Sequence, residues 1–168
     1  MDLNLRTGQL TKLVFEAYQT SEFRQRVEGI PPYTVMYNPE TLSIKLEIDR
    51  DESQGPGTSA SPMGFRRINP QDYRIEFYVD GTGATTGIPV DVPNSIMEFL
   101  HVVYDYNSEQ HRPNYVMIRY GSVLLKTVLK EVEITYNVFS PNGKPLRAKV
   151  DTTFASCLDP NLSEMINN

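Results

Sequence analysis

The residues of this chain that are capable of chemistry are few and far apart. Among its 168 residues are one cysteine, Cys157, and two histidines, His101 and His111. A metal site needs three or four converging nitrogen, sulfur or oxygen ligands, and only these histidines and scattered carboxylates are available, so we predict no metal site. Cys157 would be a nucleophile if a histidine approached it, but a lone cysteine near a strand end is more typical of a small buried side chain. We therefore predict that the protein is not an enzyme and uses no cofactor.

Two glycine-containing segments also lack the features of a nucleotide site. The segment Gly81–Pro89 (GTGATTGIP) has no lysine of the phosphate-binding type, and its glycine spacing differs from the dinucleotide fingerprint. The segment Arg50–Pro62 (RDESQGPGTSASP) has almost no apolar content. Both are predicted to be flexible connections, and Arg50–Pro62 is expected to be a mobile loop between two strands.

Composition narrows the class of protein and its partners. Hydrophobic residues make up 39% of the chain and charged residues 22%, which is typical of a soluble globular protein, and the length suffices for one domain with a core. The net charge of −5 and the lack of basic residues interleaved with aromatics argue against a nucleic-acid partner. No apolar run approaches the roughly 18 residues of a membrane span, and the N-terminus lacks a signal-peptide pattern. We predict cytoplasmic location at synthesis and no membrane insertion.

Alternation of apolar and polar residues predicts a mainly β fold. The segments Leu10–Tyr18, Leu42–Asp49 and Tyr73–Asp80 are rich in β-forming residues, and the last two alternate throughout. Their apolar sides hold Leu42, Ile44, Leu46 and Ile48 in one segment and Tyr73, Ile75, Phe77 and Val79 in the other. This period of two indicates half-buried antiparallel strands.

One helix is predicted over Val92–Tyr106, with Asp91 as its N-cap and Pro93 in its first turn. Asn107 is expected to end it in the left-handed conformation. The apolar stripe consists of Ile96, Met97, Leu100, Val103 and Tyr104. Such a stripe is expected to lie on a sheet.

The C-terminal part predicts a long hairpin. Val132, Ile134, Tyr136 and Val138 alternate on the outgoing strand, and Leu146, Ala148, Val150, Thr152 and Phe154 on the return. Because paired residues share a face, the pair numbers must sum to an even value, and this requires a loop of odd length. The segment Pro141–Gly143 satisfies this condition as a type I turn with Gly143 in a left-handed bulge.

The outer face of this hairpin is either a solvated surface or a subunit interface, and we take it as the candidate interaction surface. It carries alternating charges, and its candidate interface residues are Glu131, Glu133, Arg147 and Lys149. His111 and Arg112 are added from the loop after the helix, between Tyr104 and Tyr115. In that loop Asp105 and Asn107 are better explained as residues that cap the helix and hold the loop.

Taken together, these segments resemble a known family. The chain looks like the N-terminal tube-like domain of contractile injection system adaptor proteins, as found in antifeeding-prophage and virulence-cassette particles. The motifs that carry the resemblance are the Lys12–Tyr18 strand, VMYNPE, YRIEFYVDGTG, DVPNSIMEFLHVVYDYN, HRPNYVMIRYG and FSPNGKPLRAKV. They cover nearly the whole chain.

The resemblance implies a structural role without catalysis. It implies a β-barrel or β-sandwich of tube-protein type with one flanking helix, and a ring that joins the inner tube to the baseplate and spike. The implied partners are copies of itself in a six-fold ring, tube or tube-initiator subunits, and spike and baseplate wedge proteins. Many members continue into a LysM domain. We expect the tube-like domain to span residues 1–156 and residues 157–168 to be a polar tail or the start of a linker, with no LysM domain in this chain.

Two other functional classes stay open at this point. A small-ligand-binding β-barrel needs an apolar pocket with a few converging polar groups. A hydrolase needs a geometry that brings Cys157 to a histidine.

Overall fold

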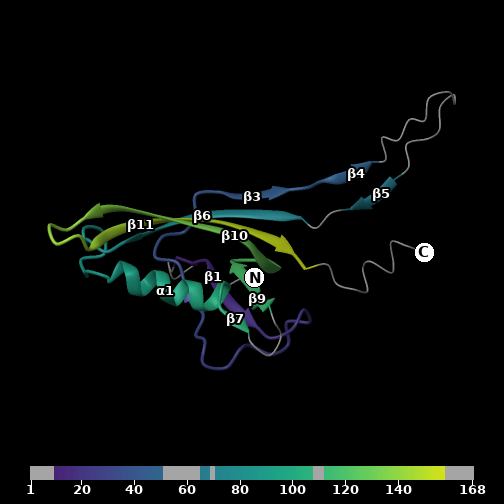
Figure 1. Cartoon of the computed structure of the whole chain (residues 1–168), viewed down its shortest axis with the longest axis horizontal. Coiled ribbons are helices and arrows are strands. Elements are labelled where there is room, and N and C mark those ends of the chain that lie inside the picture. The colour runs from purple at the N-terminus through teal and green to yellow at the C-terminus, as the bar shows by residue number, and fades with distance from the viewer. Residues whose placement is uncertain (1–9, 51–64, 69–70, 108–111, 158–168) are drawn as a thin grey trace, which may run out of the picture.

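A computed structural model describes residues 10–50, 65–68, 71–107 and 112–157. Its helix and strands run in the order shown in Figure 1: β1 Val14–Tyr18, β2 Tyr33–Thr34, β3 Leu42–Lys45, β4 Ile48–Arg50, β5 Phe65–Ile68, β6 Asp72–Asp80, α1 Val92–Val103, β7 Tyr106–Asn107, β8 Arg112–Pro113, β9 Tyr115–Tyr120, β10 Val123–Phe139 and β11 Pro145–Ser156. The predicted mobile loop Arg50–Pro62 lies, apart from Arg50, outside the described residues.

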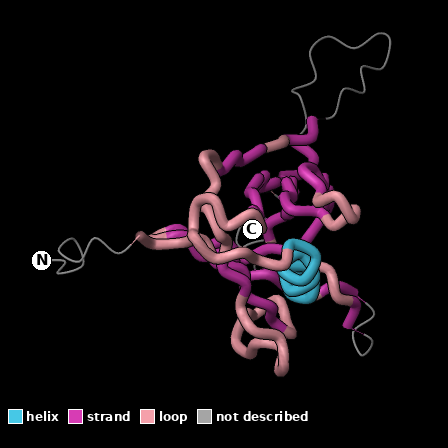
Figure 2. The backbone as a smooth tube through the Cα atoms, turned by 90° about the vertical axis from the view of Figure 1, so that its left-hand side faces the viewer, coloured by secondary structure: helices cyan, strands magenta, loops and turns pink. Residues whose placement is uncertain are grey.

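The prediction of a mainly β fold with one helix is confirmed. Seven strands form one antiparallel sheet in the order β2-β1-β9-β10-β11-β6-β3, while β4-β5 and β7-β8 form separate two-stranded pairs. Figure 2 looks along the long axis of the molecule, with α1 seen end-on beside the strands. The strand β10 is the longest element, and it pairs with β9 through its first part and with β11 through its second.

The hairpin β10–β11 has the predicted register. Tyr136 pairs with Ala148, and Asn137 with Arg147, so the pair numbers sum to an even value. At the turn, the Gly143 N–H donates to the Ser140 carbonyl at 2.9 Å, and Gly143 has a φ of +84°. Glycine tolerates this left-handed conformation because it has no Cβ.

A β-bulge at Lys130 divides β10 into two parts. Leu129 pairs with Phe154 and Glu131 with Thr153, so Lys130 is the extra residue. An extra residue shifts the alternation of faces by one position. As a result Leu129 and Val132, three residues apart, both pack against the main core.

The core lies between the sheet and α1, and aromatic rings fill it. The Phe15 ring centroid is 5.2 Å from that of Phe99, 5.9 Å from Phe77 and 5.7 Å from Phe154. The predicted inward residues of β6 and the even-numbered residues Ala148, Val150, Thr152 and Phe154 of β11 are buried. Ring contacts at these separations add to the free energy gained from burial.

The helix has the predicted N-terminus but a different buried face. The Asp91 side chain accepts a hydrogen bond from the Asn94 N–H, as an N-cap does. Of the predicted stripe, Met97 is 52% exposed and Tyr104 is 61% exposed. The buried helix residues are Val92, Ile96, Phe99, Val102 and Val103. The prediction omitted Phe99, whose spacing of three from Ile96 places it on the same helix face.

The prediction for the C-terminal end of the helix is wrong. The helix ends at Val103, and Asn107 lies in β7 rather than acting as a left-handed stop. The Asn114 side-chain amide instead donates to the carbonyls of His101 and Val102, at 3.4 Å each. Asn114, which follows the helix in the chain, therefore supplies the hydrogen-bond donor for carbonyls in the last turn of α1.

Three predicted strand features also need correction. The first strand begins at Val14, and Leu10 is exposed. The single strand predicted over Leu42–Asp49 is divided between β3 and β4, and Ile44 and Leu46 are 54% and 67% exposed. Ile44 and Leu46 are exposed mainly because α1 packs against β1, β11 and β6 and does not extend over this end of the sheet.

The hairpin tip departs from the predicted burial for the same reason. Tyr136 and Val138 were expected on the core face, but both are exposed because the hairpin extends beyond the core. Val138 has a φ of +55°, which is unusual for a β-branched residue and interrupts the pairing between Asn137 and Phe139.

Candidate assembly surface

The side chains of the sheet that point away from the core form a charged surface, which we call the outer face. It consists of Asp72, Arg74, Glu76, Tyr78 and Asp80 on β6, Arg147, Lys149 and Asp151 on β11, and Glu131 and Glu133 on β10. The alternation of the strands explains this set, since every directly paired residue shares a face. The sequence pattern predicted its β10 and β11 members.

Three ion pairs join β6 to β11 across the outer face. Arg147 donates from Nε and Nη2 to Oδ2 of Asp80, at 3.2 and 2.8 Å. Arg74 donates from Nε and Nη2 to the two oxygens of Asp151, at 3.0 and 2.6 Å. The Lys149 Nζ lies 2.8 Å from Glu76 Oε2. Arginine is suited to such planar, two-point contacts with a carboxylate.

These contacts lower the pKa of each carboxylate. Hydrogen bonds from the Thr82 hydroxyl and N–H, followed by those from Arg147, hold the pKa of Asp80 below its ordinary value. The hydrogen bond from Arg74 lowers the pKa of Asp151, and the one from Lys149 lowers the pKa of Glu76. All three carboxylates are therefore stabilised in the charged form within one chain.

The candidate interface residues thus fall into two groups. Arg147 and Lys149 are paired with acids of β6, not with the glutamates of β10 beside which the sequence placed them. Glu131 and Glu133 are exposed and form no ion pair with another described residue. Glu133 lies directly opposite Asp151, a residue of like charge. The unbalanced charge of the outer face is therefore acidic and lies on β10.

The other two candidate interface residues are not brought to this surface by the described structure. His111 lies outside the described residues. Arg112 begins β8, where it pairs with Asn107. Their predicted role in an interface stays a prediction.

The residues considered for catalysis occupy different surroundings. The His101 Nδ1 is 2.6 Å from Asp105 Oδ2 on an exposed side of α1. Cys157 follows β11 and packs against a small second cluster that contains Tyr18, Phe23, Tyr115 and Met117. Among the described residues, no group of three or more histidine, cysteine or acidic side chains is arranged to hold a metal ion.

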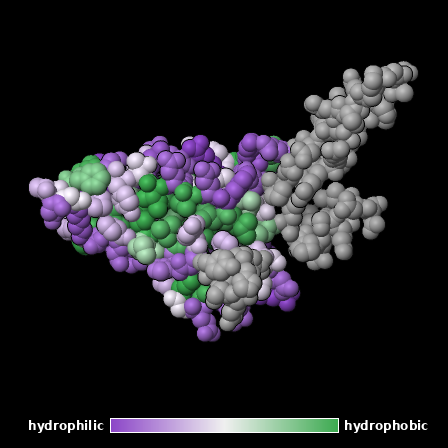
Figure 3. Space-filling view, in the orientation of Figure 1, coloured by the Kyte–Doolittle hydropathy of each residue, from purple (hydrophilic) through white to green (hydrophobic). Residues whose placement is uncertain are grey.

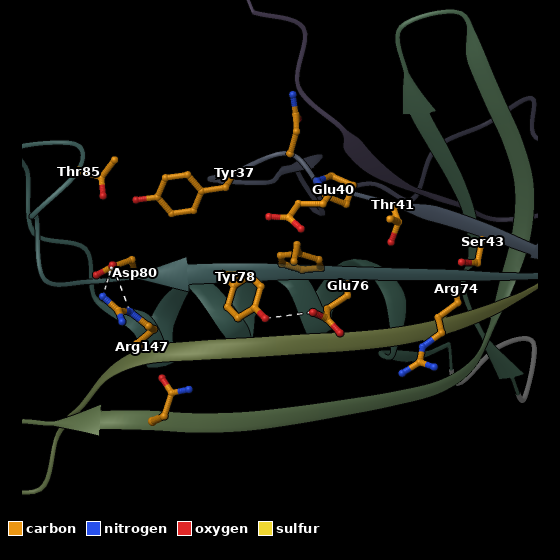
Figure 4. A pocket seen from close by; sticks show the side chains of 14 residues that line it. Tyr37, Glu40, Thr41, Ser43, Arg74, Glu76, Tyr78, Asp80, Thr85 and Arg147 are labelled. Carbon is orange, nitrogen blue, oxygen red and sulfur yellow. Dashed lines mark hydrogen bonds and ion pairs between the residues drawn. The ribbon is translucent and has the colours of Figure 1, made fainter.

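A groove of about 800 Å³ lies beside β6, and the sequence did not predict it. Figure 4 shows Tyr37, Glu40 and Thr41 on one side and Arg74, Glu76 and Tyr78 on the other. The groove exists because β3 pairs only with Asp72–Ile75, whereas β6 continues to Asp80. Phe77 lies behind the wall of the groove, because the whole residue is buried.

Besides β2, which pairs only with β1, the same sheet has two open edges among the described strands. β10 pairs with β9 only as far as Val128, so its part from Leu129 to Phe139 has a strand on one side only. β3 pairs only with β6. Figure 3 shows a band of hydrophobic side chains over the region of β10, with hydrophilic surface above it. Open edges carry unpaired N–H and C=O groups and invite another strand.

The chain matches a family of known proteins. A family model described as contractile injection system tube protein matches residues 9–165. No curated protein matches the chain. Within the described residues, none of the helical structure has the length and apolar character that crossing a bilayer requires.

Proposed function

Because the chain belongs to the contractile injection system tube protein family, we propose that it is a structural adaptor whose ring joins the inner tube of such a particle to its baseplate and spike. The family is one of structural proteins and is not an enzyme class, and its members are parts of an assembled injection particle. The adaptor role rests on the resemblance of the sequence motifs. The ring rests on the two open edges of the sheet.

Open edges favour a closed assembly. A β-sheet with long unpaired edges aggregates unless the edges are covered, and a ring of identical copies covers every edge with its opposite. The unpaired edge of β10 extends over eleven residues, from Leu129 to Phe139. We propose a six-fold ring of this chain, with tube or tube-initiator subunits on one side and spike or baseplate wedge proteins on the other.

The alternative hypothesis, a small-ligand-binding β-barrel, has one observation in its favour, the groove beside β6. Ligand sites are mostly apolar and enclose most of their ligand. This groove is lined largely by tyrosines, acids, arginines and small polar residues, and the apolar interior is occupied by phenylalanine rings. The arrangement fits a surface contact better than a pocket for a small molecule.

The ring is tested by the mass of the native assembly. We expect native mass spectrometry and electron microscopy to show six copies in one ring, either for the chain alone or after mixing with tube subunits of the same particle. Single substitutions His101→Ala, His111→Ala and Cys157→Ser are expected to leave this assembly intact. A chain that stays monomeric with every neighbouring protein present would rule the ring out, and a hydrolytic activity lost in any of these variants would rule out a purely structural role.

A further inference from the structure

The tip of the β10–β11 hairpin contains the only asparagine in the sequence that is followed by glycine. We propose that this pair, Asn142–Gly143, is a site of spontaneous deamidation and that the hairpin turn controls its rate. The inference concerns the covalent stability of the chain. It does not depend on the proposed ring or on the adaptor role.

The reaction uses only groups of the chain and water. The Gly143 backbone nitrogen attacks Cγ of the Asn142 side chain and gives up its proton, so that a new N–Cγ bond closes a succinimide ring. The Cγ–Nδ2 bond breaks, and the nitrogen takes up a proton and leaves as ammonia. Water then opens the ring at one of its two carbonyls. The product is an aspartate with the original backbone, or an isoaspartate whose main chain runs through the former side chain.

The surroundings of this pair leave room for the reaction. Both residues are exposed, and a Cβ at Gly143 would meet no atom within 4 Å. Because glycine has no side chain, nothing on Gly143 shields its nitrogen from attack. Within the described part of the chain, the hydrogen bonds of the Asn142 side chain go to Oδ1, and none holds the leaving group Nδ2.

The closed turn holds the reacting atoms back. The Gly143 N–H donates to the Ser140 carbonyl at 2.9 Å, so the attacking nitrogen is engaged. The Asn142 Oδ1 accepts hydrogen bonds from the Ser140 hydroxyl and, at 3.4 Å, from the Lys144 N–H. The side chain must rotate out of these contacts before Cγ reaches the nitrogen. The rate is therefore set by the fraction of time that the turn is open, and such local opening costs less free energy than unfolding of the sheet.

Asp80–Gly81 is a chemically related pair that the fold protects. An aspartate followed by glycine reaches the same succinimide by losing water. The Asp80 carboxylate accepts hydrogen bonds from Thr82 and Arg147, which hold it in the charged form, and a charged carboxylate is a poor electrophile. Gly81 is buried, and its N–H donates to a backbone carbonyl of β11 at 2.8 Å. We therefore expect modification at the hairpin tip and none at Asp80 in the folded chain.

Deamidation would change the hairpin tip in two ways. It adds a carboxylate close to Lys144, whose Nζ lies 2.9 Å from Oδ2 of Asp91, the N-cap of α1. The isoaspartate form also lengthens the main chain of the turn by a carbon atom. Because the turn sets the register of a hairpin, this form disturbs the pairing next to the tip.

Peptide mass spectrometry of the whole chain tests the proposal, with isoaspartyl methyltransferase to detect the isoaspartate form. The chain is incubated at mildly alkaline pH, either folded or unfolded in urea. Asn142 is expected to deamidate slowly in the folded chain and many-fold faster in urea. Ser140→Ala removes a hydrogen bond from the turn and is expected to raise the rate in the folded chain about fivefold, which corresponds to about 1 kcal/mol.

Two variants serve as controls. Asn142→Ser removes the reacting amide and should give no product at this position. Thr85→Ala removes an exposed hydroxyl outside the turn and should keep the wild-type rate. Circular dichroism first establishes that each variant is folded.

Each outcome decides one part of the inference. Absence of deamidation at Asn142 even in urea overturns the site. Equal rates in the folded chain, in urea and in Ser140→Ala overturn control by the turn, and the comparison with urea decides this point even where Ser140→Ala fails to fold. Equal modification of Asn142 and Asp80 in the folded chain overturns the protection of the buried pair.

Discussion

Asp80 shows how single residues hold this fold together. Its carboxylate accepts hydrogen bonds from the Thr82 N–H and hydroxyl and from Arg147, and it lies where β6 ends and the loop to α1 begins. The sequence marked Arg147 as a charged surface residue. It gave no indication that Asp80 is its partner, because the two are 67 residues apart and their pairing depends on the order of strands.

The first prediction concerns pH. The pKa of Asp80 is lowered in the folded state, so its stabilising contribution is full above the unfolded pKa and is lost as the pH falls through the lower folded pKa. The thermal unfolding temperature is therefore expected to fall on the acid side of the ordinary aspartate value of 3.8. Asp80→Asn should weaken this pH dependence. Glu133→Gln, at an exposed site without an ion pair to a described residue, should keep it, and equal slopes in both variants would contradict the assignment.

A second prediction concerns Gly81. A Cβ at this position would lie 2.4 Å from the Val90 carbonyl oxygen and 2.7 Å from Val92 Cγ2, so Gly81→Ala forces the start of α1 away from the end of β6. Overpacking of this kind typically lowers the free energy of unfolding by about 1–3 kcal/mol. Urea denaturation measures the change, with the exposed Thr85→Ala as a control. Equal stability of the two variants would show that Gly81 has more room beside Val90 and Val92 than these distances indicate.

At the scale of elements, period-two alternation predicted β6 and β11 well because both are covered along their length. It failed for β3, whose alternation is equally regular, because burial depends on how far α1 extends over the sheet. Ile44 is therefore exposed although its spacing is that of a core residue. The helix itself was recognised from Asp91 and the apolar spacing, but the choice between Met97 and Phe99 as the buried residue depended on the rings of the facing strands.

The helix face gives the third prediction. Phe99 is fully buried against Phe15, Phe77 and Tyr33, so Phe99→Ala leaves a cavity and is expected to lower the free energy of unfolding by about 3–5 kcal/mol. Met97→Ala, on the exposed side of α1, should change it by less than about 0.5 kcal/mol. Chemical denaturation of both variants measures the difference. A larger loss of stability in Met97→Ala than in Phe99→Ala would support the buried helix face expected from the sequence.

At the scale of the whole molecule, the outer face contributes to folding, and its role in assembly is our proposal. Arg147 and Lys149 were expected to act between copies, yet within the chain they already bind Asp80 and Glu76. Their reversal therefore affects the fold and any interface together. Substitutions of Glu131 and Glu133 test the proposed assembly role separately from folding, because no ion pair with another described residue involves them.

The fourth prediction separates these roles. Glu131→Lys combined with Glu133→Lys should leave the unfolding temperature of the single chain nearly unchanged and weaken ring or particle assembly. Exposed ion pairs contribute only about 0.2–1 kcal/mol each, so specificity should suffer more than strength. Arg147→Glu combined with Lys149→Glu should lower the unfolding temperature as well. Circular dichroism reports the fold and electron microscopy the particle yield, and a wild-type yield from the glutamate variant would show that this part of the outer face is only solvated.

The bulge at Lys130 changes which alternate residues of β10 face the core. Before it, one set of alternate residues faces the core, and after it the other set does, so one continuous strand supplies inward side chains to both halves of the sheet. Deletion of Lys130 would keep the order of all other hairpin residues. It would exchange the core-facing and outward-facing side chains of one half of β10 relative to the other half. Two sequences of this kind that differ by one residue in this strand would therefore have to be aligned with a gap at this position, even where the letters on either side match without one.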